Sequence, residues 1–203
     1  MVTSSRKEPT DDLRHLTSVR KLILLACAAL LVAALKYTDH PGLRAAARGL
    51  TLPFKAALLY AKEPDRELAV PVEGVAVKQI GDSWHVPRSG GRRHEGQDIF
   101  ARRGTAVRSA TDGYVVQVGE SPLGGKTVFV LGAGGRSYYY AHLDSYTPGL
   151  AVGDYVTPET VLGYVGTTGN AAGTPPHLHF GVYTSAGAVN PLPLLSAGTR
   201  PSG

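Results

Sequence analysis

The stretch Pro175-Pro176-His177-Leu178-His179-Phe180 alternates polar and apolar side chains, as a half-buried β-strand does. Because successive side chains of a strand point to opposite faces, His177 and His179 share one face, and Leu178 and Phe180 share the other. The apolar face is expected to pack in a core, so the opposite face presents two imidazoles. Imidazole is the commonest metal ligand among side chains and titrates near neutral pH. The stretch therefore predicts a strand that carries a metal-binding or proton-transferring site.

Short strands separated by tight turns are expected from Val70 onward. The 203-residue chain contains 25 glycines and 14 prolines, and many of them separate runs rich in Val, Tyr and Thr. The connections are too short for crossover helices, so the fold class is all-β with antiparallel sheets. A long loop of small residues, Gly166–Pro176, precedes the histidine pair and is expected to border a site. The expected strands are Val75–Ile80, Thr105–Ser109, Tyr114–Val118, Thr127–Leu131, Ser137–Leu143, Val161–Val165 and Leu178–Tyr183.

The N-terminal part of the chain has a different character. Fourteen apolar residues, Leu22–Leu35, lie between Arg20-Lys21 and Lys36. As a helix they would measure about 21 Å, which is shorter than a hydrocarbon core of ~30 Å, although flanking lysines can recover part of the difference. We predict an uncleaved, single-pass anchor in the inner (cytoplasmic) membrane; a signal segment that is cleaved on secretion is the alternative.

An amphipathic helix is expected next, from Leu43 to Ala61, where Pro53 is a point of possible interruption. The sequence thus divides into a cytoplasmic tail (1–19), a transmembrane anchor or signal segment (20–37), a juxtamembrane helical linker (38–69), a β domain (70–193) and a flexible tail (194–203).

Basic charge is concentrated beside the apolar run. Residues 1–62 hold ten Lys/Arg against four Asp/Glu, whereas the remainder holds eleven against twelve. This pattern favours contact with anionic lipid, and without a basic stripe interleaved with aromatic residues we expect no nucleic-acid partner. Cys27 is the single cysteine, so an intrachain disulfide is excluded. A second group of basic residues flanks His94 and forms either a solvated face or a contact surface for carboxylates of an acidic substrate: Arg88, Arg92, Arg93, Arg102, Arg103 and Arg108.

A divalent metal site is predicted upstream of the histidine pair, in His94-Glu95-Gly96-Gln97-Asp98. On a straight strand His94 and Asp98 would lie about 13 Å apart, so they can bind one ion only if the chain curls, which Gly96 would permit. With His179 as the third ligand, two histidines, a carboxylate and an open position for water form the arrangement of hydrolytic zinc. Such zinc lowers the pKa of its water to about 7 and polarises a carbonyl.

Two further imidazoles are then left without a metal ligand role. They are His142, in Tyr140-Ala141-His142-Leu143, and His177. Unligated imidazoles near a metal are suited to proton transfer and to stabilising an oxyanion.

In this combination and order, the motifs resemble the lysostaphin-type (LytM-like) zinc metalloendopeptidases, which carry an H-x-x-x-D motif, a strand ending in Ala-His and a late H-x-H. The resemblance extends from about Val70 to Pro193 and includes Gly104-Thr105-Ala106-Val107, Asp112-Gly113-Tyr114-Val115 and Gly153-Asp154-Tyr155-Val156. It implies antiparallel sheets that form a groove, in a barrel-sandwich-hybrid-like fold, over one zinc ion per chain. It also implies ligands at His94, Asp98 and His179, and a catalytic pair at His142 and His177.

The sequence departs from the family at two places. Gln97 stands where an aliphatic residue is usual before the aspartate, and Thr174-Pro175-Pro176 replaces a glycine-proline lead-in. Neither change removes a ligand, so we expect effects on loop shape and substrate preference.

The resemblance implies a membrane-anchored endopeptidase that hydrolyses peptide cross-links of peptidoglycan with zinc-activated water on the extracytoplasmic (periplasmic) side. Its expected partners are peptidoglycan stem peptides, the membrane and regulators of wall hydrolases. The alternative is a non-catalytic LytM-like domain that binds peptidoglycan or activates another hydrolase. Relatives of that kind typically lack some of the five metal and catalytic residues, all of which this chain keeps. A lipoyl-type carrier is disfavoured because neither Lys78 nor Lys126 lies in a suitable turn motif.

Overall fold

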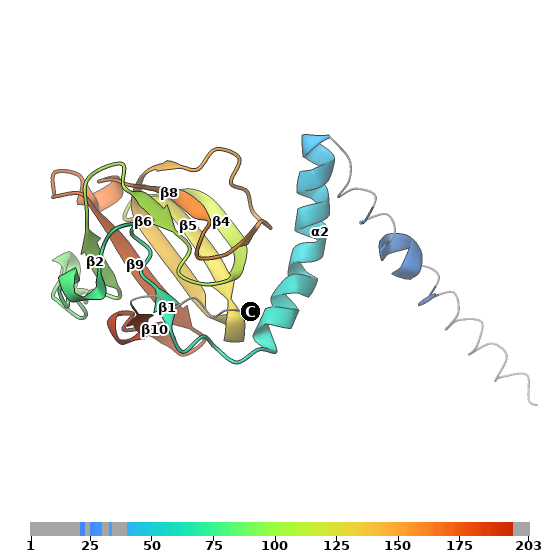
Figure 1. Cartoon of the computed structure of the whole chain (residues 1–203), viewed down its shortest axis with the longest axis horizontal. Coiled ribbons are helices and arrows are strands. Elements are labelled where there is room, and N and C mark those ends of the chain that lie inside the picture. Colours follow the sequence, from blue (N-terminus) through green and yellow to red (C-terminus); the bar gives the residue numbers. More distant parts are fainter. Residues whose placement is uncertain (1–20, 23–24, 30–32, 34–39, 197–203) are drawn as a thin grey trace, which may run out of the picture. The chain divides into compact units, whose positions relative to one another are not determined.

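The structure is a computed structural model that describes residues 21–22, 25–29, 33 and 40–196 of the chain (Figure 1). The predicted cytoplasmic tail (1–19) lies outside the described residues, as does most of the predicted anchor (20–37). Among the helices of the described part, none is both long enough and apolar enough to cross a membrane.

Helix α2 (Pro41–Tyr60) is the long helix of the described chain and corresponds to the one expected from Leu43 to Ala61. It runs through Pro53 without interruption. The chain divides into two compact units, residues 1–50 and 51–203, and every described strand belongs to the second. That α2 acts as a spacer beside a membrane stays a prediction.

The second unit is built on a nine-stranded sheet in which every pairing is antiparallel, which confirms the predicted mostly-β, antiparallel class. The main strand order is β10-β9-β6-β5-β4-β7; β2 pairs with β9, and β8 pairs with β3 and β6. The strands are β2 (Gln97–Phe100), β3 (Ala106–Arg108), β4 (Gly113–Ser121), β5 (Gly125–Gly132), β6 (Ser137–Tyr146), β7 (Tyr155–Val156), β8 (Val161–Val165), β9 (His177–Thr184) and β10 (Gly187–Val189).

Several details differ from the prediction, among them the short strands β2, β7 and β10, which were not predicted. Val75–Ile80 is not a strand, because Val77–Gln79 forms a 3₁₀ turn in which the Gln79 side chain accepts a hydrogen bond from the Ala76 N–H. A parallel pair, β1 (Leu68–Ala69) and β11 (Leu195–Ser196), extends the ordered β structure beyond 70–193 and into the predicted tail (194–203). Both of its leucines are buried, so this pair joins the first and last strands of the described β structure to the core.

Strand β9 has the apolar face and the polar face that its alternation predicts. Leu178, Phe180 and Val182 are fully buried with Tyr140 of β6 and Ile99 of β2. Each such side chain contributes about 1.5–3 kcal/mol through burial. Strand β9 lies between β2 and β6, as Figure 1 shows. Its polar face therefore receives side chains from both neighbours.

Candidate metal centre

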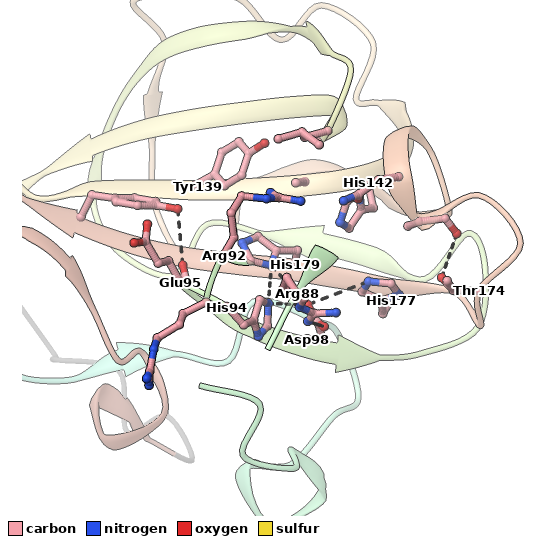
Figure 2. Close-up of a pocket in the computed structure, with 17 residues that line it drawn as sticks. Arg88, Arg92, His94, Glu95, Asp98, Tyr139, His142, Thr174, His177 and His179 are labelled. Atoms are coloured by element: carbon pink, nitrogen blue, oxygen red, sulfur yellow. Dashed lines mark hydrogen bonds and ion pairs between the residues drawn. The ribbon is translucent and has the colours of Figure 1, made fainter. Parts of the chain in front are cut away.

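A pocket of about 410 Å³ opens on the polar face of β9 (Figure 2). All five predicted site residues line it: His94, Asp98, His142, His177 and His179. The loop Gly166–Pro176 borders it as expected, through Asn170, Ala171 and Thr174. The fold thus brings together residues that lie up to 85 positions apart in the sequence.

Three of these residues form a compact triangle of ligand atoms. His94 Nε2 lies 2.8 Å from His179 Nδ1 and 3.0 Å from Asp98 Oδ1, and His179 Nδ1 lies 3.2 Å from Asp98 Oδ1. His94 Nδ1 donates to the Ser83 carbonyl at 2.6 Å, so Nε2 carries the lone pair of the neutral ring. One shared proton cannot satisfy all three atoms together, whereas a cation can. Two imidazole nitrogens and a carboxylate oxygen are the donor set that zinc prefers, so the residues fit this ion.

The curl between His94 and Asp98 is present, and Gly96 makes room for it. A Cβ atom at Gly96 would lie 2.6 Å from His179 Cε1 and 2.7 Å from the Phe180 carbonyl oxygen. The sequence argument assigned Gly96 backbone freedom; the structure shows that the requirement is space, because its φ is not in the left-handed region. His94 precedes β2, and Asp98 lies within β2 opposite His179. The three candidate ligands therefore come from the loop before β2 and from two adjacent strands.

Asp98 is held as a carboxylate. Burial acts to raise its pKa, but hydrogen bonds with His179 and His94 and an ion pair with Arg88 outweigh burial and hold the pKa well below its usual range. Arg88 binds Oδ2, which leaves Oδ1 directed at the two histidines, and Figure 2 shows this arrangement. Arg88 is thus part of the candidate metal centre.

His142 reaches the pocket through an unusual backbone conformation. Tyr138 and Tyr140 point into the core and Ala141 pairs with His179, so simple alternation would place His142 on the core face. Its φ is +62°, in the left-handed region, and the register of β6 against β8 shifts just after it. This bulge turns the imidazole into the pocket. The Thr168 carbonyl then accepts a hydrogen bond from His142 Nδ1 at 2.9 Å.

His177 is oriented in the same way. Its Nδ1 donates to the Pro175 carbonyl at 2.9 Å, and its Nε2 lies 3.9 Å from Asp98 Oδ1. The rings of His142 and His177 are 5.1 Å apart between centroids. Burial lowers the pKa of His142 to about 4, so that this ring is neutral at pH 7. The His142 ring therefore presents Nε2 as a proton acceptor.

The structure adds residues that sequence reasoning missed. Tyr139 and Tyr183 line the pocket, and the pairing of Ala141 with His179 explains why Tyr139 lies on this face. Alternation from Ala141 could have identified it. Of the flanking arginines, Arg103 and Arg108 pair with acidic residues outside the pocket. Arg102 does not line the pocket, and Arg88 is paired with Asp98. Arg92 and Arg93 therefore remain as the candidates for contact with an acidic substrate.

Comparisons with known proteins point to one family of peptidases. The model of peptidase family M23 matches residues 92–191. The chain is 38% identical over 121 residues to the L-Ala--D-Glu endopeptidase of Bacillus subtilis (strain 168), in a match that covers 55% of this chain and 37% of that protein. The chain thus spans well under half the length of this curated relative.

Two solved structures are similar to part of this chain. The catalytic domain of the antimicrobial peptidase lysostaphin from Staphylococcus simulans matches with a TM-score of 0.51 and 31% identity, covering 58% of this chain and 92% of that one. A zinc containing peptidase from Vibrio cholerae matches with a TM-score of 0.52 and 27% identity, covering 62% of this chain and 39% of that one. The first match covers nearly the whole of a catalytic domain.

Proposed function

The chain belongs to peptidase family M23, and on this premise we propose that it is a zinc endopeptidase that hydrolyses peptide bonds of peptidoglycan. The observation that carries the proposal is the convergence of three ligand atoms and two oriented imidazoles in one pocket. The Bacillus subtilis relative is named for the bond between L-alanine and D-glutamate, which supports a wall peptide as the substrate.

His94 Nε2, Asp98 Oδ1 and His179 Nδ1 would hold one zinc ion per chain. When bound, zinc supplies a Lewis acid that lowers the pKa of water and polarises a peptide carbonyl. The ion pair of Asp98 Oδ2 with Arg88 keeps the carboxylate charged and fixed in orientation. Arg88 thereby favours ligation by Oδ1.

His142 and His177 supply the proton transfers. Their Nδ1 atoms donate to backbone carbonyls, so Nε2 of either ring can accept a proton from the water that attacks the peptide carbonyl. The carbon–oxygen bond then forms, and the same proton passes to the departing amine nitrogen as the carbon–nitrogen bond breaks. The ring returns to its neutral state, which the lowered pKa of His142 favours. The pair therefore acts first as base and then as acid.

The surroundings of the pocket suit an extended peptide. Tyr139 and Tyr183 present aromatic surfaces beside the ligands, and the 59% exposed side chain of Phe100 lies against His177, with ring centroids 5.2 Å apart. Arg92 lines the pocket (Figure 2), and we infer that its guanidinium group binds a substrate carboxylate.

We propose further that residues 20–37 tether the enzyme to the cytoplasmic membrane, with the peptidase unit on the extracytoplasmic side. The apolar run Leu22–Leu35, bracketed by basic residues, supports this proposal. Regulators of wall hydrolysis are expected partners there.

Metal analysis of the purified full chain, alongside digestion of isolated peptidoglycan, tests the proposed function. We expect one zinc per chain, and soluble fragments whose masses identify the bond that is cut. Stoichiometric zinc without cleavage of any wall preparation would contradict the proposal and favour a non-catalytic, peptidoglycan-binding domain.

A further inference from the structure

Gln97, at the position where the sequence departs from its family, is fully buried and makes four hydrogen bonds. Its amide nitrogen donates to Asp82 Oδ1 at 3.0 Å and to Asn190 Oδ1 at 3.1 Å. Its Oε1 accepts from the backbone N–H and from the hydroxyl of Ser83, both at 2.9 Å. Every donor and acceptor site of the amide group is therefore used.

Ser83 connects this amide to two metal ligands. The Ser83 carbonyl accepts from His94 Nδ1 at 2.6 Å, and the Ser83 hydroxyl oxygen accepts from the Asp98 N–H at 3.0 Å. The backbone beyond Ser83 is also paired with His94, because the Val86 carbonyl accepts from the His94 N–H and the His94 carbonyl accepts from the His85 N–H. The position of Ser83 thus fixes both the ring of His94 and the backbone of Asp98.

We propose that Gln97 is a positioning residue for the metal centre, which holds Ser83 in the place where it orients His94 and Asp98. An aliphatic side chain at position 97 could fill the same volume but could not hold Ser83. Gln97 also holds Asp82, whose pKa is lowered because Gln97 and the Trp84 N–H both donate to its carboxylate. The loop of residues 82–84 is therefore bound to Gln97 at three atoms.

A second anchor restrains Gln97 itself. Asn190 Oδ1 accepts from Gln97 and also from the Leu192 N–H, which ties the amide to the turn after β10. Gln97 is the first residue of β2, one position before Asp98. Restraint at residue 97 consequently limits the motion of the adjacent ligand. Groups that hold a metal-ligating histidine or carboxylate in place typically change metal affinity by about 10- to 100-fold.

The inference rests on the proposed function for the identity of the metal, so its test measures zinc binding without any wall substrate. Gln97→Leu in the full chain is expected to weaken zinc affinity about 10- to 100-fold, measured by competition with a chromophoric chelator. Cobalt(II) substituted for zinc should show an altered visible absorption spectrum, because its ligands are held less rigidly. A chain that binds zinc normally but does not digest peptidoglycan would refute the proposed function and leave this inference intact.

Two further variants separate positioning from general stability. Thr111 is buried outside the pocket, and its hydroxyl donates to Asp65. Thr111→Val removes this hydrogen bond as a control, and the variant should keep native zinc affinity. Ser83→Ala removes the acceptor for the Asp98 N–H and should weaken zinc binding on its own. Because Gln97 acts through Ser83, the double variant should lose less affinity than the product of the two single losses.

Native zinc affinity in Gln97→Leu, an equal loss in Thr111→Val, or fully multiplicative losses in the double variant would each overturn the inference.

Discussion

Replacing His142 by alanine or by glycine separates the cost of its backbone conformation from the loss of its imidazole. At φ = +62°, a residue with a Cβ atom is destabilised by about 1–2 kcal/mol relative to glycine. Glycine in turn loses about 0.5–1 kcal/mol of conformational entropy relative to alanine. The difference between the mid-points of these ranges predicts that His142→Gly is more stable than His142→Ala by about 0.75 kcal/mol. For a chain of this size this corresponds to roughly 1–4 °C in melting temperature.

Urea unfolding of the full-length variants, followed by the fluorescence of the single tryptophan, Trp84, measures this difference. Glu120→Ala and Glu120→Gly form the matched control pair, because Glu120 is exposed on β4 and has no positive φ. At that position the glycine variant should be the less stable by about 0.5–1 kcal/mol. If the glycine variant were the less stable one at position 142 as well, the left-handed backbone conformation would have no cost there. The bulge could then not be what directs His142 into the pocket. Both His142 variants should bind zinc and lose turnover.

Three other perturbations test the site. His179→Ala should lose zinc and peptidoglycan hydrolysis together in metal analysis and digestion assays, and equal zinc content in the variant and the original chain would contradict its role as a ligand. Gly96→Ala should weaken zinc binding at least 10-fold in chelator competition, because its methyl group would meet the His179 ring, whereas Gly119→Ala, with open space around it, should bind zinc normally. In the metal-free chain the pKa of His142 is about 4, against 6.5 when unfolded, so folding favours the neutral ring. The neutral ring contributes its full stability above pH 6.5, and this contribution is lost as pH falls from 6.5 towards 4. The melting temperature of His142→Ala should therefore fall less over this range than that of the original chain. An identical fall in the two proteins would refute the lowered pKa of His142.

Strand β9 shows how much of the fold is predictable from the sequence. Its alternation identifies both faces, and Leu178 and Phe180 are indeed fully buried while His177 and His179 face the pocket. Strands β5, β6 and β8 also lie where runs of Val and Tyr predict them. β2, β7 and β10 were missed, and their four, two and three residues show little periodicity. Their positions are decided by pairing with longer strands.

The identity of the clustered site residues was predictable, but the means of bringing them together was not. A sequence period places His142 with Tyr140 in the core, and only the bulge in β6 reverses its direction. The sequence suggests that position 96 requires glycine for its backbone freedom, whereas in the structure the nearby ring of His179 leaves no room for a side chain there. Both effects depend on neighbours that are distant in sequence. Local sequence propensity therefore cannot predict either the bulge in β6 or the need for space at Gly96.

The orientation of the imidazoles depends on backbone atoms, which no residue type reveals. His94, His142 and His177 each donate Nδ1–H to a main-chain carbonyl, those of Ser83, Thr168 and Pro175. Each bond fixes the tautomer and presents Nε2 to the pocket. Side-chain substitutions at these three loop positions leave the carbonyls in place, so they change the orientation of the imidazoles only by moving the loops. Residues that hold these loops in place, as Gln97 holds Ser83, are therefore the positions at which a substitution away from the imidazoles should change the chemistry of the site.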